Sequence, residues 1–217
     1  MPRIEGVLLD PVGCLAEFPS EPFHAIANRF FGKPGPQKKP SRSGSRAYWH
    51  LLNLMQAAGR SLDDAERRAA EALEMEAVVR ATVYEDVAPA LEELQGMGIG
   101  LYIASSLSQA AVTQFLEQSG LSEFFSGVWN RDNAGGRKAE PLAMALEGAF
   151  LQPERASFLT DTAEGLKVAK GVGVNAILMM NDPDEARRLA MLEPAGGIVS
   201  LHELPDFIRL VAAAPVR

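Results

Sequence analysis

The feature that most constrains the fold is an alternation of short apolar runs and helical stretches that begins near residue 83 and continues almost to the end of the chain. Strands are expected at residues 99–104, 127–130, 156–160, 175–179 and 198–200. Helices are expected at residues 89–97, 108–118 and 141–150, and another from residue 165. Strands that alternate with helices predict βαβ units and a parallel sheet covered on both faces. We therefore expect an α/β fold with a Rossmann-like parallel sheet.

The segment between the first strand and this alternating region differs in character. A first buried strand is expected at residues 4–9, an apolar run that leads directly into Asp10. The segment that follows is rich in Pro, Gly and Lys at 32–40 and in Ser and Arg at 41–46, with helical patterns at 47–58 and 62–79. We expect a core domain made of residues 1–15 and 83–217, and a small inserted α-helical cap at residues 16–82.

Composition excludes several classes of function. The 217 residues carry a net charge of −7 and the sequence pI is about 5.1, which argues against a nucleic-acid binder and against docking on anionic membranes. A single cysteine, Cys14, allows no disulfide within the chain, as is usual in a reducing cytosol. The N-terminus has no signal-peptide pattern, and no apolar run reaches the length of a membrane span. We expect a cytoplasmic protein, and the sequence indicates no particular oligomeric state.

Polar residues stand where the expected strands end. Asp10 follows the first strand, Ser105 and Ser106 follow the second, and Asp161 follows strand 156–160. Lys138 precedes a helix. In open parallel sheets, ligands bind beyond the carboxyl ends of the strands, so two carboxylates, a hydroxyl and an ammonium group are expected at one crevice.

This set of groups suits phosphoryl chemistry. Two carboxylates can hold Mg²⁺, which prefers oxygen ligands and keeps several waters. A carboxylate can also attack phosphorus to give an aspartyl-phosphate. A hydroxyl and a lysine can stabilise the charged phosphoryl oxygens. The expected substrate is a small phosphorylated or otherwise anionic molecule.

The order and spacing of these residues resemble the four motifs of the haloacid dehalogenase (HAD) hydrolase superfamily, over nearly the whole chain. The first motif corresponds to residues 8–15 (Leu-Leu-Asp-Pro-Val-Gly-Cys-Leu) and the second to 103–106 (Ile-Ala-Ser-Ser). The third corresponds to 137–141 (Arg-Lys-Ala-Glu-Pro), and the fourth to 158–166 (Phe-Leu-Thr-Asp-Thr-Ala-Glu-Gly-Leu). The family also places a helical cap between its first two motifs, where residues 16–82 lie.

The resemblance implies a role for each matching residue. Asp10 corresponds to the nucleophile, Lys138 to the conserved lysine, and Ser105 to the hydroxyl that contacts the phosphoryl group, with Ser106 as its substitute if the register is off by one. Mg²⁺ would be held by Asp10, Asp161 and the backbone carbonyl of Val12.

The chain departs from the family pattern at several of these positions. Phosphatases of the family have a second aspartate two residues after the nucleophile, which acts as general acid and base, and this chain has Val12 there. General acid–base catalysis contributes about 10²–10⁴-fold, so phosphatase activity should suffer unless another group substitutes. Cys14, Ala139 and Thr160 also replace the usual residues.

Three functions therefore remain open: a Mg²⁺-dependent phosphatase, a catalytically degenerate HAD protein that binds a phosphorylated ligand or a partner, and a hydrolase that acts at carbon. HAD dehalogenases have an aspartate where this chain has Gly165. Phosphonatases use a cap lysine as a Schiff base; Lys33, Lys38 and Lys39 lie in the expected cap, but nothing in the sequence marks one of them as that lysine. Residues 101–106 and 125–127 faintly resemble the enolase-phosphatases.

Each candidate residue also has a purely structural interpretation. Asp161 and Ser105 are residue types that cap helix N-termini, Asp10 suits a turn, and Lys138 suits a solvated loop. Cys14 is expected to be a small buried residue rather than a reactive thiol. The segment between Glu21 and Asp63 has no acid but contains seven basic residues, which either attract an anionic substrate or form a solvated loop: Arg29, Lys33, Lys38, Lys39, Arg42, Arg46 and Arg60.

Overall fold

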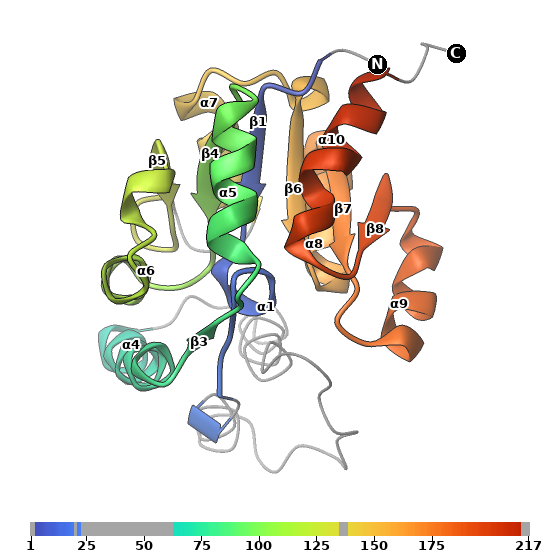
Figure 1. Ribbon diagram of the computed structural model, residues 1–217. Coiled ribbons are helices and arrows are strands. Elements are labelled where there is room, and N and C mark those ends of the chain that lie inside the picture. The colour runs from blue at the N-terminus through green and yellow to red at the C-terminus, as the bar shows by residue number, and fades with distance from the viewer. Residues whose placement is uncertain (1–2, 20, 23–62, 135–138, 214–217) are drawn as a thin grey trace.

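The computed structural model describes residues 3–19, 21–22, 63–134 and 139–213. Its main element is a six-stranded sheet with the order β5-β4-β1-β6-β7-β8, in which every neighbouring pair is parallel (Figure 1). The strands are β1 (Gly6–Leu9), β4 (Gly100–Ala104), β5 (Gly127–Trp129), β6 (Ala156–Thr160), β7 (Asn175–Met179) and β8 (Gly196–Ile198). The expected α/β fold with a parallel sheet is confirmed.

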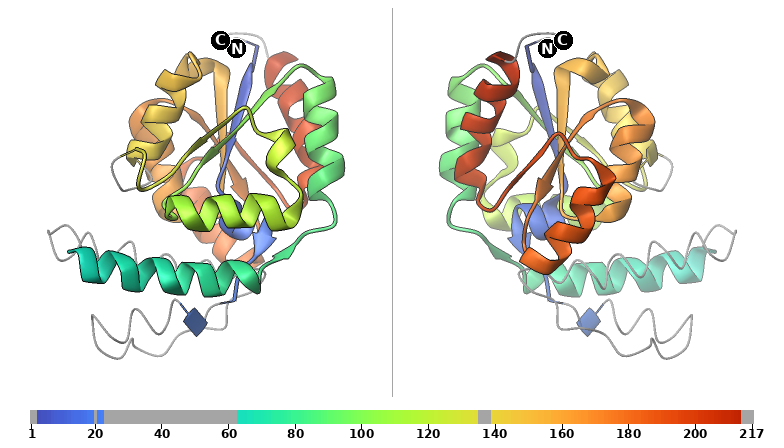
Figure 2. Two further views of the ribbon diagram at one scale, coloured as in Figure 1. Left: turned by 90° about the vertical axis from the view of Figure 1, so that its left-hand side faces the viewer. Right: turned by 90° about the vertical axis from the view of Figure 1, so that its right-hand side faces the viewer.

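Helices cover both faces of this sheet. The main described helices are α4 (Asp64–Val79), α5 (Val87–Gly96), α6 (Gln109–Ser119), α7 (Ala139–Gly148), α8 (Ala163–Val172), α9 (Pro183–Leu189) and α10 (Leu204–Ala213). Figure 2 shows the sheet edge-on, with α5 and α10 on one side and α7 and α8 on the other. None of the described helices is both long enough and apolar enough to cross a membrane.

The alternation of side chains along β1 builds a core on each face. Val7 and Leu9 belong to the apolar cluster under α5, α6 and α10, whereas Leu8 belongs to the cluster under α7, α8 and α9. Successive side chains of a strand point to opposite faces, so a strand covered on both sides must be apolar at every position. This requirement explains the continuous apolar run that precedes Asp10.

The chain leaves the core and returns to it at a short antiparallel pair of strands. Strand β2 (Ala16–Glu17) pairs with β3 (Thr82–Val83), so that Ala16 lies opposite Val83. These positions coincide with the expected limits of the cap. The intervening patterns at 32–40, 41–46 and 47–58 lie outside the described residues, so the division into core and cap stays a prediction.

Helix α4 is the longest described part of that segment, and it packs directly on the core. Its N-terminus carries a capping box, in which Asp63 accepts hydrogen bonds from the backbone of Ala65 and Glu66 and Glu66 accepts one from the Asp63 backbone. Ala70, Ala77 and Val78 share an apolar cluster with residues of α6. The left view of Figure 2 shows α4 next to α6, beyond the carboxyl end of the sheet.

Several element boundaries differ from expectation. Helix α8 begins at Ala163 rather than 165, because the Thr162 hydroxyl accepts a hydrogen bond from the Gly165 amide and caps the helix. Strand β8 lies at Gly196–Ile198 instead of 198–200. Helices α9 and α10 were not anticipated, although Asp182 followed by Pro183 is a typical helix start.

Candidate active site

Asp10 lies where the order of strands in the sheet reverses. From β1 the chain proceeds to β4 on one side and later to β6 on the other. Leu9 is in register with Ile103 of β4 and with Leu159 of β6, so Asp10 is flanked by the ends of both strands. Such a switch point at the carboxyl edge is where open α/β sheets bind ligands.

On the β4 side, a buried hydroxyl contacts Asp10. Ser105 Oγ donates a hydrogen bond to Asp10 Oδ1 at 3.2 Å, and the exposed fractions of the two residues are 0% and 1%. The Leu107 amide donates to Ser105 Oγ at 3.3 Å, and the Ser105 amide donates to the Trp129 carbonyl at 3.0 Å. The hydroxyl is therefore held against Asp10 from both its own backbone and the following loop.

The structural alternative for Ser105 does not apply, because Ser108 caps α6. The Ser108 side chain accepts a hydrogen bond from the Ala111 amide at 3.3 Å. Ser106, the alternative in register, is also buried, but its Oγ has no hydrogen-bond partner among the described residues. The structure thus brings Ser105, rather than Ser106, into contact with Asp10.

On the β6 side, Asp161 is held by an asparagine. Asn181 Nδ2 donates to Asp161 Oδ2 at 3.1 Å and to the Gly13 carbonyl at 2.9 Å. One amide group thereby joins the loop after Asp10 to the end of β6. Asp161 is not the cap of α8, since Thr162 has that role. Asn181 was missed from sequence, although a polar residue soon after β7, the strand next to β6, was a signal that could have found it.

The side chain of Val12 points into the protein interior. Its exposed fraction is 2%, and it belongs to the apolar cluster that also contains Cys14 and Leu15. The tight turn after it needs Gly13, whose φ is 76°. Cys14 is buried, with Sγ 3.7 Å from the Leu159 carbonyl, as expected for a structural cysteine.

Gly165 has no room for a side chain. A Cβ at this position would overlap the Oγ1 atom of Thr160. Thr160 is itself buried, and its Oγ1 lies 3.2 Å from Thr162 Oγ1. The aspartate that dehalogenases of the resembled family carry here would displace this pair of threonines.

The donor atoms at this edge suit a hard cation. Asp10, Asp161 and the Val12 carbonyl supply oxygen only, which Mg²⁺ prefers, and Mg²⁺ is commonly bound through one or two carboxylates plus water. The described residues contain no cluster of three or more His, Cys, Asp or Glu that could hold a metal, so a site here would depend on this smaller set. Asn181 Oδ1 is buried and has no hydrogen-bond partner in the described part of the chain, which leaves an acceptor beside Asp161 for a metal-bound water.

Several residues that the sequence predicts to act at the site lie outside the part of the chain that the structure describes. Lys138 lies outside the described residues, as do Lys33, Lys38, Lys39 and the remaining basic residues of the 21–63 segment. Their roles stay predictions.

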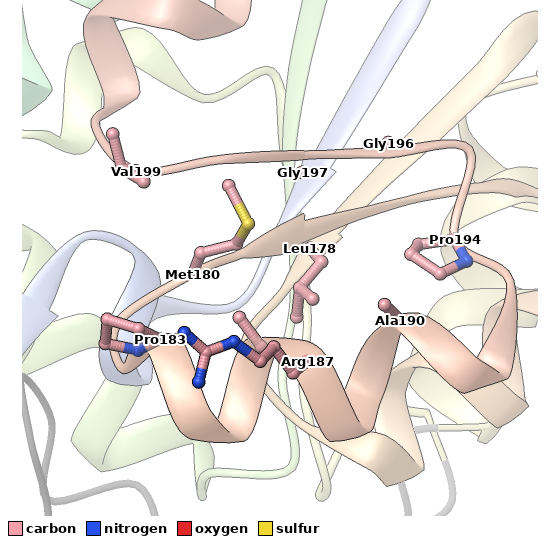
Figure 3. A pocket seen from close by; sticks show the side chains of 10 residues that line it. Leu178, Met180, Pro183, Arg187, Ala190, Pro194, Gly196, Gly197 and Val199 are labelled. Atoms are coloured by element: carbon pink, nitrogen blue, oxygen red, sulfur yellow. The ribbon is translucent and has the colours of Figure 1, made fainter.

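An apolar pocket of ≈530 Å³ lies between α9 and the strands β7 and β8 (Figure 3). Its lining is Leu178, Met180, Pro183, Ala186, Arg187, Ala190, Pro194, Gly196, Gly197 and Val199. Arg187 is the charged residue of this set, and its guanidinium is paired with Asp184 at 2.7 Å. A phosphoryl group needs several donors, so this pocket is a poor match for one.

The chain is similar to known proteins in sequence and in fold. The model of the family described as haloacid dehalogenase-like hydrolase matches residues 24–179. Enolase-phosphatase E1 of Anopheles gambiae is 33% identical over 46% of this chain and 35% of its own length. Phosphoglycolate phosphatase of Pseudomonas savastanoi pv. phaseolicola is 26% identical over 56% of this chain and 46% of its own. The chain thus matches less than half the length of each of these two curated relatives.

Solved structures share the fold. A predicted phosphatase from Clostridium acetobutylicum superimposes with a TM-score of 0.74 at 17% identity, covering 96% of this chain and 99% of that one. L-2-haloacid dehalogenase from Xanthobacter autotrophicus gives a TM-score of 0.61 at 18% identity, covering 95% and 98%. The family match extends over most of the chain, and the chain belongs to the haloacid dehalogenase-like hydrolases.

Proposed function

We propose that this protein is a Mg²⁺-dependent phosphatase that hydrolyses a small phosphorylated metabolite through an aspartyl-phosphate at Asp10. The observation that carries the proposal is the buried contact of Ser105 Oγ with Asp10 Oδ1 at the reversal of the sheet. Asp161, at the end of the neighbouring strand, supports it. The curated relatives are named as phosphatases, which favours phosphorus over carbon as the reacting centre.

The reaction requires two displacements at phosphorus. A carboxylate oxygen of Asp10 attacks and forms an O–P bond, while the bond to the leaving oxygen breaks and its electron pair leaves with that oxygen. Water then attacks the aspartyl-phosphate and releases phosphate with free Asp10. The Ser105 hydroxyl, whose oxygen is fixed by the Leu107 amide, can turn its proton from Asp10 to a phosphoryl oxygen. Lys138 would pair with the same phosphoryl group.

Asp10, Asp161 and the Val12 carbonyl would hold Mg²⁺. When bound, the cation neutralises charge on the phosphoryl oxygens and helps to align the groups that react. Asn181 fixes the Asp161 carboxylate relative to the Gly13 carbonyl, so the two loops that would share the ion have a defined separation.

Val12 cannot transfer a proton, so position 12 offers no general acid or base for the reaction. Because Val12 is apolar and buried, the leaving oxygen would depart without a proton from this position. Phosphoesters with acidic leaving groups, such as aryl or enol phosphates, should therefore react faster than alkyl phosphates.

The residues 16–82 would form the cap over this site. The seven basic residues between Glu21 and Asp63 would favour an anionic substrate there through their local field. The net charge of −7 and the absence of a membrane-spanning helix among the described residues fit a cytoplasmic enzyme that acts on small molecules.

A second function, ligand binding without turnover, is favoured by the same buried Val12. The retained Asp10, Ser105 and Asp161 oppose it. Carbon-centred hydrolysis is disfavoured, because the aspartate that the dehalogenases carry has no space at Gly165.

Hydrolysis of an aryl phosphate with and without Mg²⁺ tests the proposal, since an aryl leaving group needs little protonation. Wild-type protein should turn over only with Mg²⁺, and Asp10→Asn should be inactive. Asp206→Asn, the same chemical change at an exposed residue of α10, is the matched control and should be fully active. Wild-type turnover no higher than that of Asp10→Asn would overturn the phosphatase proposal and leave the binding function.

A further inference from the structure

A buried ion pair connects helix α4 to the core next to Ser105. Arg131 Nη1 lies 2.5 Å from Glu74 Oε1, and Arg131 Nη2 donates to Glu74 Oε2 at 3.1 Å. The side chains are 6% and 0% exposed. Glu74 comes from α4, within the segment predicted to be the cap, whereas Arg131 follows β5 in the core. The two-pronged geometry fixes both side chains in direction as well as in distance.

Both members of the pair also bind the loop that carries Ser105. Arg131 Nη1 donates to the Ser106 carbonyl at 3.2 Å, and Glu74 Oε2 accepts from the Ser108 amide at 3.0 Å. The Arg131 amide in turn donates to the Leu107 carbonyl at 3.0 Å. The backbone of residues 106–108 is thus held at three points by these two residues, and that loop includes the Leu107 amide that fixes Ser105 Oγ.

Stability alone is a weak explanation for this arrangement. Replacing a buried ion pair by apolar residues of similar volume is often neutral or stabilising, because the charges lose their hydration. Apolar residues would fill the space between α4 and the loop, but they could not bind the Ser106 carbonyl or the Ser108 amide. What the charged pair adds is the position of the loop backbone.

We propose that Glu74 and Arg131 are positioning residues that hold the 105–108 loop so that the Ser105 hydroxyl meets Asp10 and, in the reaction, the phosphoryl group. The inference rests on the proposed function for its catalytic consequence. It also makes α4 part of the catalytic framework: a helix outside the predicted core sets the geometry of a residue inside it.

The test uses the apolar double variant Glu74→Leu/Arg131→Met in the full-length chain. The matched control is Glu93→Leu/Arg209→Met, which removes the half-exposed pair between α5 and α10. Two quantities are measured: hydrogen exchange of the amides of residues 105–108, and kcat and KM for an aryl phosphate with Mg²⁺. A displacement of about 1 Å far from the chemistry can cost about 10²-fold in rate.

We expect faster exchange at residues 105–108 and a kcat about 10²-fold lower in the double variant, at a Tm close to that of the wild type. KM should change less than kcat, because the hydroxyl acts mainly on the charge that develops during the reaction. Arg131→Lys keeps the charge but lacks the two-pronged contact, so its kcat should lie between those of the wild type and the double variant. If the double variant does not fold, exchange and kcat are measured on Arg131→Lys instead.

Unchanged exchange at residues 105–108, or a kcat within twofold of the control, would overturn the inference. Failure of the proposed function looks different: wild-type protein would itself be inactive with the aryl phosphate. The exchange measurement would still decide whether Glu74 and Arg131 position the loop.

Discussion

The two flanks of Asp10 are built in different ways. On the β4 flank, Ser105 and its loop are fully buried and held by the Glu74–Arg131 pair. On the β6 flank, Asp161 is only partly buried, and Asn181, which donates a hydrogen bond to it, is itself partly exposed.

This difference matches what each flank would have to do in the proposed phosphatase. A hydroxyl that stabilises developing charge acts best when it is fixed in advance in a dry site. A Mg²⁺ site must keep room for the waters that the ion retains. Substitutions on the β4 flank should therefore reduce kcat, whereas those on the β6 flank should act mainly through metal affinity.

Val12→Asp should produce the largest gain in activity, because it adds a proton-transfer group that the β4 flank cannot supply. We expect kcat/KM for an alkyl phosphate to rise by about 10²-fold, the lower end of the usual gain from general acid–base catalysis, because position 12 is buried. Aryl phosphate hydrolysis should change much less.

Val12→Asn is the matched control, because asparagine is similar to aspartate in size and polarity but does not transfer a proton. Both variants should lower Tm, because a polar group at this site replaces an apolar one in the core. An equal gain in both would show that space or polarity, rather than proton transfer, limits the wild-type protein.

Ser105→Ala should lower kcat for the aryl phosphate by about 10²–10³-fold, the usual effect of removing one donor that stabilises transition-state charge. The Mg²⁺ concentration for half-maximal activity should stay the same, because Ser105 lies on the flank away from Asp161. Ser106→Ala is the control of equal size and should retain most of the activity. If the two serines exchanged these effects, the register of the second motif would have to move by one residue.

Asn181→Ala should act on the other flank. It removes the donor that fixes Asp161, and loss of such a partner to a metal ligand typically costs about 10–100-fold in metal affinity. The measurement is the increase of Tm with Mg²⁺ concentration, which needs no turnover, together with the Mg²⁺ dependence of rate. A fall in kcat at saturating Mg²⁺ with unchanged affinity would contradict the assignment of this flank to the metal.

Much of this arrangement could be predicted from sequence. The apolar run before Asp10 and the strand before Asp161 are buried on both sides, so hydrophobicity alone reveals them and places the two residues at the same edge of the sheet. The same rule places a serine hydroxyl, of Ser105 or of Ser106, close to Asp10. Only the structure chooses between Ser105 and Ser106, because adjacent side chains point in different directions and the sequence does not show which of them faces Asp10.

The partners of these residues could not be predicted in the same way. Glu74 and Arg131 are 57 positions apart, and each looks like an ordinary surface charge on its own segment. Asn181 contacts Gly13 across 168 positions. Such contacts depend on how separate elements pack, and a single sequence carries no periodic signal for them.

Thr162→Ala should have the smallest effect. It tests whether the cap of α8 also contributes to the position of the Asp161 carboxylate. Its hydroxyl caps α8, and loss of a cap costs about 1 kcal/mol of stability, measured as the free energy of unfolding in urea. Rate and Mg²⁺ affinity should stay within about twofold if Asn181, rather than the start of α8, fixes the Asp161 carboxylate. Thr162→Ser, which keeps the capping oxygen, should restore most of the stability. A loss of Mg²⁺ affinity as large as that of Asn181→Ala would show instead that the start of α8 positions Asp161, and the β6 flank would then be as firmly organised as the β4 flank.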